Sequence, residues 1–90
     1  NQDALMVDAK YDGHEDYGYN FLAEHSDGEE YTLTFQKVND AILKEFDLNA
    51  EVLVGAKFKI TYTTKIVVTK DADGYDDENE INTITKLEKL

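Results

Sequence analysis

Apolar and polar residues alternate along three stretches of the chain, at residues 17–24, 30–36 and 57–63. In the second stretch, aromatic and aliphatic residues occupy every other position, and threonine and glutamine residues occupy the positions between them. Alternation with a period of two is typical of strands that bury one face. We therefore predict three strands whose aromatic faces line a core rather than a binding platform. The residues assigned to that core are Tyr17, Tyr19, Phe21, Ala23, Tyr31, Leu33, Phe35, Phe58, Ile60 and Tyr62.

The two ends of the chain are predicted to form strands as well. Residues 4–11 alternate in a way that turns Leu5, Val7 and Ala9 inward. In residues 81–90 the apolar positions are spaced by three, which suits a helix, but the threonines among them are poor helix formers. We expect this last segment to close the sheet as a strand that contains a bulge.

Three Asp-Gly pairs separate β-like runs, at residues 12–13, 27–28 and 73–74. Asp-Gly supplies the positive φ angles that tight hairpins need, so we predict a turn at each pair. Tyr11 and Tyr75 then fall in loops. If the hairpin tips gather at one end of the fold, their many carboxylates repel one another, and added salt should raise the melting temperature.

One segment breaks the alternation. Residues 40–46 place Ile42 and Phe46 on one side of a short helix, with Asn39 as the expected N-cap. A single helix between the third and fourth strands is the order of the OB-fold, a small Greek-key barrel. We therefore predict a mainly β chain, an antiparallel OB-like barrel of five to six strands that forms one domain over residues 1–90.

Two motifs carry a resemblance to known proteins. They are G-x-x-F-x-I-x-Y, formed by Gly55, Phe58, Ile60 and Tyr62, and I-x-x-I-x-K-L, formed by Ile81, Ile84, Lys86 and Leu87. Together they resemble small OB-like domains of exported bacterial proteins, often lipoproteins, whose roles are mostly unassigned. The resemblance implies a barrel and an extracytoplasmic location, in the periplasm or at the cell surface, and it assigns no functional residue. The chain begins at Asn1 rather than Met, which agrees with removal of a leader.

Composition and charge exclude several classes of function. The chain has no cysteine and two distant histidines, which argues against a disulfide framework and a structural zinc site. It has 20 acidic residues and 9 lysines, for a net charge of −11, and the one local concentration of lysine is at Lys57, Lys59 and Lys65. Nucleic-acid binding needs a basic stripe, and a membrane span needs about 20 apolar residues. We expect neither, and predict a protein or a surface ligand as the partner, with the oligomeric state left open.

The segment DADGYDDENE, residues 71–80, holds six acidic side chains and is the sharpest candidate site. Calcium accepts about 6–8 oxygen ligands in flexible geometry. Counting from Asp71, however, the fifth and sixth positions are Tyr75 and Asp76, which departs from the EF-hand spacing. The segment is therefore either a solvated loop or an irregular calcium site, and we expect no other cofactor. The candidate calcium ligands are Asp71, Asp73, Asp76, Asp77 and Glu78.

Residues suited to catalysis are sparse. His14 lies among the acidic residues of the segment DGHED, and its pairing with Asp16 would suit a small hydrolase or a transition-metal site. His25 lies near another predicted hairpin tip, so a two-histidine site would form if the tips met. The single serine, Ser26, lies in that tip, and no nucleophile motif surrounds it. We predict a non-catalytic domain with a binding or structural role, and the alternative is a calcium-binding module.

Overall fold

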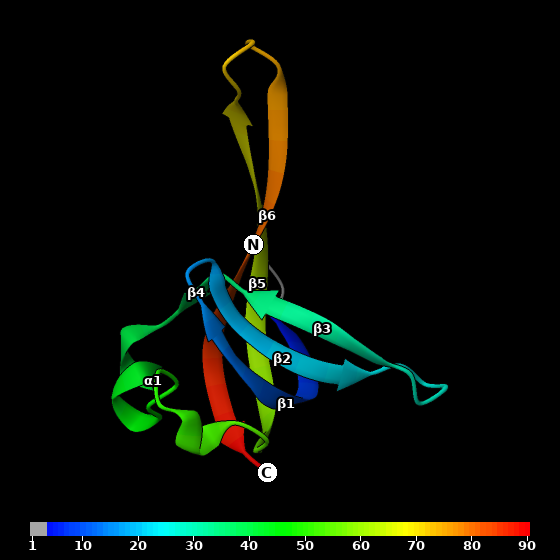
Figure 1. The fold of residues 1–90 in the computed structure, drawn as a ribbon, viewed down its shortest axis with the longest axis vertical. Coiled ribbons are helices and arrows are strands. Elements are labelled where there is room, and N and C mark those ends of the chain that lie inside the picture. The colour runs from blue at the N-terminus through cyan, green and yellow to red at the C-terminus, as the bar shows by residue number, and fades with distance from the viewer. Residues whose placement is uncertain (1–3) are drawn as a thin grey trace.

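A curled, six-stranded sheet makes up most of the computed structural model, which describes residues 4–90 (Figure 1). In chain order the elements are β1 (Leu5–Glu15), β2 (Gly18–Glu24), β3 (Glu30–Phe35), β4 (Lys37–Val38), α1 (Asp40–Glu45), the short 3-10 helix η1 (Glu51–Leu53), β5 (Lys57–Lys70) and β6 (Asp76–Lys89). The strands lie in the order β3-β2-β1-β5-β6-β4, and all neighbours are antiparallel except β4 and β6. The predicted mainly β fold with one short α-helix is confirmed, although the two-residue strand β4, which the sequence did not predict, lies between the third strand and the helix.

The sheet curls because its two edges are joined by the chain itself. β3 lies at one edge and β4 at the other, yet only Gln36 separates them in sequence. The edges must therefore meet, and β4 pairs in parallel with β6 through Lys37 and Val38. This closure gives the strand order of the small Greek-key barrel that the sequence predicts.

The core lies inside this barrel and includes most of the residues predicted from the alternation, together with Leu48, Ile84 and Leu87. Phe21, Phe35, Phe58 and Ile60 are fully buried. Phe21 packs edge-on against Phe35 and Phe58, with ring centroids 5.5 and 6.3 Å apart. Such pairs add about 0.5–1.5 kcal/mol to the stabilisation from burial alone. The helix α1 contributes Ile42, whose side chain is also buried.

Two tyrosines differ from the prediction in their burial. Tyr11 was expected in a loop but is buried in β1, where its hydroxyl donates a hydrogen bond to the carbonyl oxygen of Leu48. The pair Asp12-Gly13 is no hairpin turn, because β1 continues through it with a shift in register, and Gly13 has a φ of 117°. The turn follows at residues 16–17, which leaves Tyr17 61% exposed instead of in the core. The sequence showed the Asp-Gly pair but not the burial of the tyrosine before it.

The ends of the predicted elements show smaller differences. Leu5 was expected to face inward but is 46% exposed, since it pairs with Tyr62 where the barrel ends. Asn39 precedes α1, yet its side chain makes no capping hydrogen bond, and its carbonyl oxygen accepts one from the Ile42 N–H instead. The closing strand with a bulge is confirmed, because the pairing of β5 with β6 skips Thr85.

The hairpin of β5 and β6 extends well beyond the barrel (Figure 1). We call its outer part, residues 65–81, the arm. The sequence placed a ten-residue loop at residues 71–80, and this was wrong in its second half. Residues 76–80 belong to β6 and pair with residues 66–70 of β5, so only residues 71–75 form the turn. The acidic side chains of this half are therefore displayed on a strand.

Candidate functional site

The first candidate surface is the side of the sheet that faces away from the core. In OB barrels the strands that correspond to β2 and β3 commonly carry the ligand on this side. We call it the outer face and define it by the paired, outward-facing residues of β1, β2, β3 and β5. They are Asp8, Lys10, Asn20, Leu22, Glu24, Glu30, Thr32, Thr34, Lys57 and Lys59.

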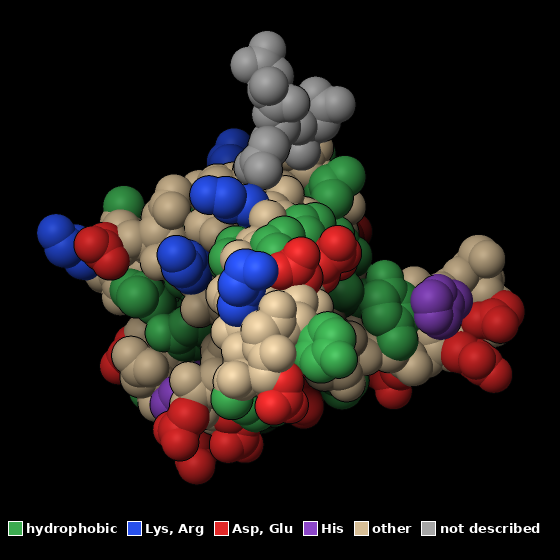
Figure 2. All heavy atoms as spheres, turned by 90° about the horizontal axis from the view of Figure 1, so that it is seen from above, with side chains coloured by type: hydrophobic (Ala, Val, Ile, Leu, Met, Phe, Trp, Pro, Cys, Tyr) green, Lys and Arg blue, Asp and Glu red, His purple; other side chains and the backbone are tan. Residues whose placement is uncertain are grey.

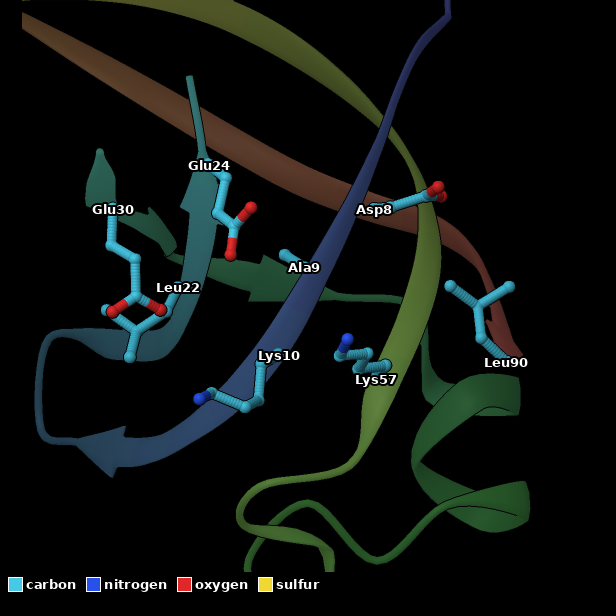
Figure 3. Close-up of a pocket in the computed structure, with 8 residues that line it drawn as sticks. All are labelled: Asp8, Ala9, Lys10, Leu22, Glu24, Glu30, Lys57 and Leu90. Carbon is cyan, nitrogen blue, oxygen red and sulfur yellow. The ribbon is translucent and has the colours of Figure 1, made fainter. Parts of the chain in front are cut away.

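Charges of one sign lie opposite each other at two places on the outer face. Glu24 pairs with Glu30 across β2 and β3, and Lys10 pairs with Lys57 across β1 and β5. Like charges directly opposite each other destabilise a sheet. A hollow of about 370 Å³ separates these groups, and Figure 3 shows the two glutamates and the two lysines around it. The outer face thus offers only carboxylates on β2 and β3, whereas β1 and β5 carry the lysines together with Asp8, which lies opposite Lys59.

The outer face has little capacity for stacking against bases. None of the residues that define it is aromatic. One exposed aromatic ring lies beside it, that of Tyr17 in the turn before β2, where its hydroxyl accepts a hydrogen bond of 3.0 Å from the Asn20 side chain. Single-strand binding surfaces use several stacked aromatics in a positively charged groove. The outer face has neither property over β2 and β3.

A second hollow, of about 610 Å³, lies between β1 and the segment that follows α1. It contains His14 but not Asp16, so the two residues of the hydrolase hypothesis do not share it. Tyr11 also lines this hollow, and burial, helped by the charges of Tyr19 and Asp47, raises its pKa to about 12. Its hydroxyl stays protonated at neutral pH and is held by a backbone carbonyl, so it is no general base.

The two histidines lie far from each other. His14 pairs with Tyr19 near the start of β2, and His25 follows the last residue of that strand. Figure 2 shows the histidine side chains on opposite sides of the molecule. The His25 ring stacks on Tyr31, with centroids 4.1 Å apart and an angle of 21° between the planes. The condition for a two-histidine site, that the two hairpin tips meet, is therefore not fulfilled.

The acidic turns do not gather at one end either. The turn between β1 and β2, the turn between β2 and β3, and the tip of the arm point in three different directions (Figure 1). Residues 16–17 and 25–29 lie beyond opposite ends of β2, because consecutive strands of a meander turn at alternate ends. The predicted mutual repulsion of the tips therefore has no structural basis, and repulsion is confined to each hairpin.

The five candidate calcium ligands are divided between the turn and the strand. Asp71 and Asp73 lie at the tip, and the Asp71 Oδ1 accepts hydrogen bonds of 2.9 and 3.0 Å from the N–H groups of Asp73 and Tyr75. Asp76, Asp77 and Glu78 are consecutive in β6, so their side chains alternate between the faces of the arm. Within residues 4–90, no three His, Cys, Asp or Glu side chains are grouped so that they could hold a metal ion. Calcium binding by these residues stays a prediction.

The second candidate surface is the arm itself. Every residue from 68 to 80 is exposed, and Tyr75 at the tip is 73% exposed. On one face of the arm Ile66 lies opposite Glu80 and Val68 lies opposite Glu78, and both aliphatic side chains are more than half exposed. An isolated two-stranded hairpin is at best marginally stable in water. The alternation of residues 57–63 does not show that the strand continues to Lys70 or that these aliphatic side chains stay uncovered.

Comparison with protein families gives no match, and comparison with curated proteins gives none. Solved structures do match in fold. One is the mitochondrial single-stranded DNA-binding protein Rim1 of S. cerevisiae. It is 13% identical to this chain, the match covers 100% of this chain and 95% of that chain, and the TM-score is 0.60. At this identity the likeness shows the fold alone, that of a small OB-like β domain, and it says nothing of export. Among residues 4–90, no helix is both long and apolar enough to cross a membrane.

Proposed function

We propose that this chain is a non-catalytic OB-like binding domain whose ligand is a polypeptide. The observation that carries the proposal is the arm, a two-stranded ribbon that holds Ile66 and Val68 in water, 53% and 56% exposed. Aliphatic side chains that remain exposed together on a projecting element are a feature of interaction sites. An extracytoplasmic location stays a prediction from the sequence resemblance.

The proposal of a non-catalytic role rests on the arrangement of the titratable residues. The hollow that His14 lines does not include Asp16, and the histidines lie at opposite ends of β2. A general base must lie within hydrogen-bond reach of a nucleophile or a substrate, and it is normally oriented by a third group. The described hydrogen bonds of the chain include none made by a histidine side chain.

Single-stranded nucleic acid is the second candidate ligand, and the likeness in fold to the yeast single-stranded DNA-binding protein favours it. Charge argues against it at both candidate surfaces. On the outer face Glu24 and Glu30 would meet the phosphates over β2 and β3, and the arm carries six acidic residues against Lys65 and Lys70. Binding to phosphates draws its affinity from neutralisation by lysine and arginine. We therefore place the polypeptide ligand first.

One titration and one selection distinguish the two candidate ligands. The purified chain is titrated into a fluorescent single-stranded oligonucleotide and used in parallel to select binders from a displayed peptide library. We expect enriched peptides and no oligonucleotide binding at about 150 mM NaCl. Oligonucleotide binding with a Kd of about 10⁻⁶ M or tighter, weakened by salt, would make the nucleic acid the ligand and refute the proposal.

A further inference from the structure

The backbone of β6 has a defined orientation where it leaves the barrel. The N–H of Asn82 donates a hydrogen bond of 2.8 Å to the Gln36 Oε1, and the carbonyl oxygen of Ile84 accepts one of 3.1 Å from the N–H of Asn39. Both groups therefore point away from β5, toward the side of the sheet where β4 lies. In an antiparallel pair, residues alternate between bonding to the partner strand and pointing away from it. The pairing of residues 76–82 with residues 64–70 is regular, so the peptide groups of Glu80 and Glu78 point to that same side.

Among the described residues, this edge of β6 has a strand beside it only near the middle of β6. β4 pairs with Thr83 and Ile84, and within the part of the chain that the structure describes no strand lies beside residues 76–80 on that edge. An open edge presents unpaired N–H and C=O groups, and extended peptides bind to such edges as an added strand. β4 therefore fills the position beside β6 for two residues, and the same position is open along residues 76–80 of the arm.

The acidic side chains along this edge favour a basic peptide as the added strand. Glu78 and Glu80 stand on the face that also carries Ile66 and Val68. Among residues 4–90 the single ion pair in the arm joins Lys70 and Asp76, at 3.5 Å, so both glutamates are without a cation within the arm. Lysine or arginine side chains of an added strand would pair with these carboxylates while their methylene stems approach the exposed aliphatic pair.

We propose that the edge of β6 at residues 76–80 binds an extended basic polypeptide as an added strand. This inference rests on the proposed function and names its site and the chemistry of its ligand. A second copy of the arm is disfavoured as the occupant, because its own acidic strand would bring like charges together. Acidic side chains on an edge block self-pairing for this reason and leave a basic segment as the complementary partner.

The test uses labelled peptides of about nine residues, long enough for one strand. Three peptides alternate threonine with lysine, glutamine or glutamate, and their binding to the full chain is measured by fluorescence anisotropy. We expect the lysine peptide to bind at least about tenfold more tightly than the others, and more weakly in higher salt. Amide hydrogen exchange provides a second readout. Binding should protect the N–H groups of Glu78 and Glu80 and leave that of Asn79, which faces β5, unchanged.

Matched variants separate pairing along the edge from attraction between charges. Glu78→Gln and Glu78→Pro remove the same charge, but only the proline removes the outward N–H and blocks the edge. We expect Glu78→Pro to weaken binding of the lysine peptide at least about tenfold more than Glu78→Gln does. Glu15→Gln, outside the arm, should leave the affinity unchanged. If Glu78→Pro unfolds the arm, as judged by circular dichroism, Glu80→Pro repeats the test at the next outward peptide group.

The outcomes separate this inference from the proposed function. Equal affinities of Glu78→Pro and Glu78→Gln, or tighter binding of the glutamine or glutamate peptide, would overturn the edge site and leave a polypeptide ligand in place. Failure of all three peptides to bind would also overturn the edge site. In that case the library selection and the oligonucleotide titration decide the proposed function independently.

Discussion

The side-chain amide of Asn82 donates a hydrogen bond of 3.1 Å to the carbonyl oxygen of Thr34, 48 residues away in sequence. β3 and β6 are not neighbours in the hydrogen-bonded order of the sheet, so this contact ties together strands that no ladder joins. The amide oxygen of Asn82 also accepts a hydrogen bond of 2.8 Å from the Thr64 hydroxyl. Asn82 is the one buried polar residue of the described chain, and it lies where the core ends and the arm begins.

Replacing Asn82 should therefore destabilise the barrel. In Asn82→Ala the carbonyl of Thr34 and the hydroxyl of Thr64 lose their partners at a part-buried site, which we expect to lower the free energy of unfolding by about 1–3 kcal/mol. Asn79→Ala is the matched control on the same strand, because that side chain is exposed and its hydrogen bond to Thr69 is 3.4 Å long. Urea unfolding measures both. Equal losses in the two variants would show that the Asn82 network does not close the barrel.

Tyr11 also makes a long-range hydrogen bond, to the carbonyl oxygen of Leu48, and its raised pKa predicts that the stability of the fold depends on pH. Burial raises its pKa from 10.0 to about 12, so the folded chain retains the hydroxyl proton to higher pH than the unfolded chain does. The stabilisation linked to this proton is fully present below pH 10 and is lost as the pH rises from 10 toward 12. Tyr11→Phe also removes the hydrogen bond to Leu48, which should cost about 1–3 kcal/mol near neutral pH.

Unfolding measured across this range compares the native chain with Tyr11→Phe. The native chain should lose stability more steeply with pH, and the difference between the two proteins should narrow toward pH 12. All other ionisable groups are the same in both proteins, so the comparison isolates Tyr11. If the difference in free energy of unfolding between the two proteins stays constant up to pH 12, groups other than Tyr11 cause the alkaline loss of stability.

The facing glutamates of the outer face predict a stabilising substitution. In Glu30→Lys the new ammonium group lies opposite Glu24, which replaces repulsion with attraction and should raise stability by about 0.2–1 kcal/mol at low salt. Glu29→Lys makes the same change in net charge in the turn before β3, away from that pair. Thermal unfolding of both variants at low and high NaCl tests the pair. A gain of the same size in Glu29→Lys would mean that net charge, rather than the pair, sets the effect.

The fold could be predicted from the sequence wherever side chains alternate strictly. Phe21, Phe35 and Phe58 stand on the predicted inward faces and are buried there, since a period of two fixes the face of each strand residue. The errors fall where a local turn signal competed with burial. Asp12-Gly13 suits a turn as well as a bulge, and the deciding contact is that of Tyr11 with Leu48, 37 residues away. The residues near Asp12-Gly13 in the sequence contain no information about a partner so far along the chain.

The candidate surfaces were harder to predict than the fold. The acidic segment was recognised, but its composition also suits a loop, and only the pairing of residues 76–80 with β5 shows that its glutamates stand on a strand. The like-charged pair Glu24 and Glu30 depends on the register of β2 and β3, and the alternation sets the facing of each strand but not which residues lie opposite each other. The open edge of β6 depends on the point at which β4 ends.

The calcium hypothesis leads to a prediction about the tip of the arm. The carboxylate of Asp71 already accepts two backbone hydrogen bonds, and the side chains of Asp76 and Asp77 point to opposite faces. We therefore expect CaCl₂ and MgCl₂ of equal ionic strength to change the melting temperature equally, through screening of the arm's carboxylates. Asp71→Asn keeps an acceptor oxygen for the turn and should leave the melting temperature nearly unchanged, whereas Asp71→Ala should lower it. A rise specific to calcium that disappears in Asp71→Asn would establish a site at the tip, because a turn that needed only the acceptor oxygen would not respond to loss of the charge.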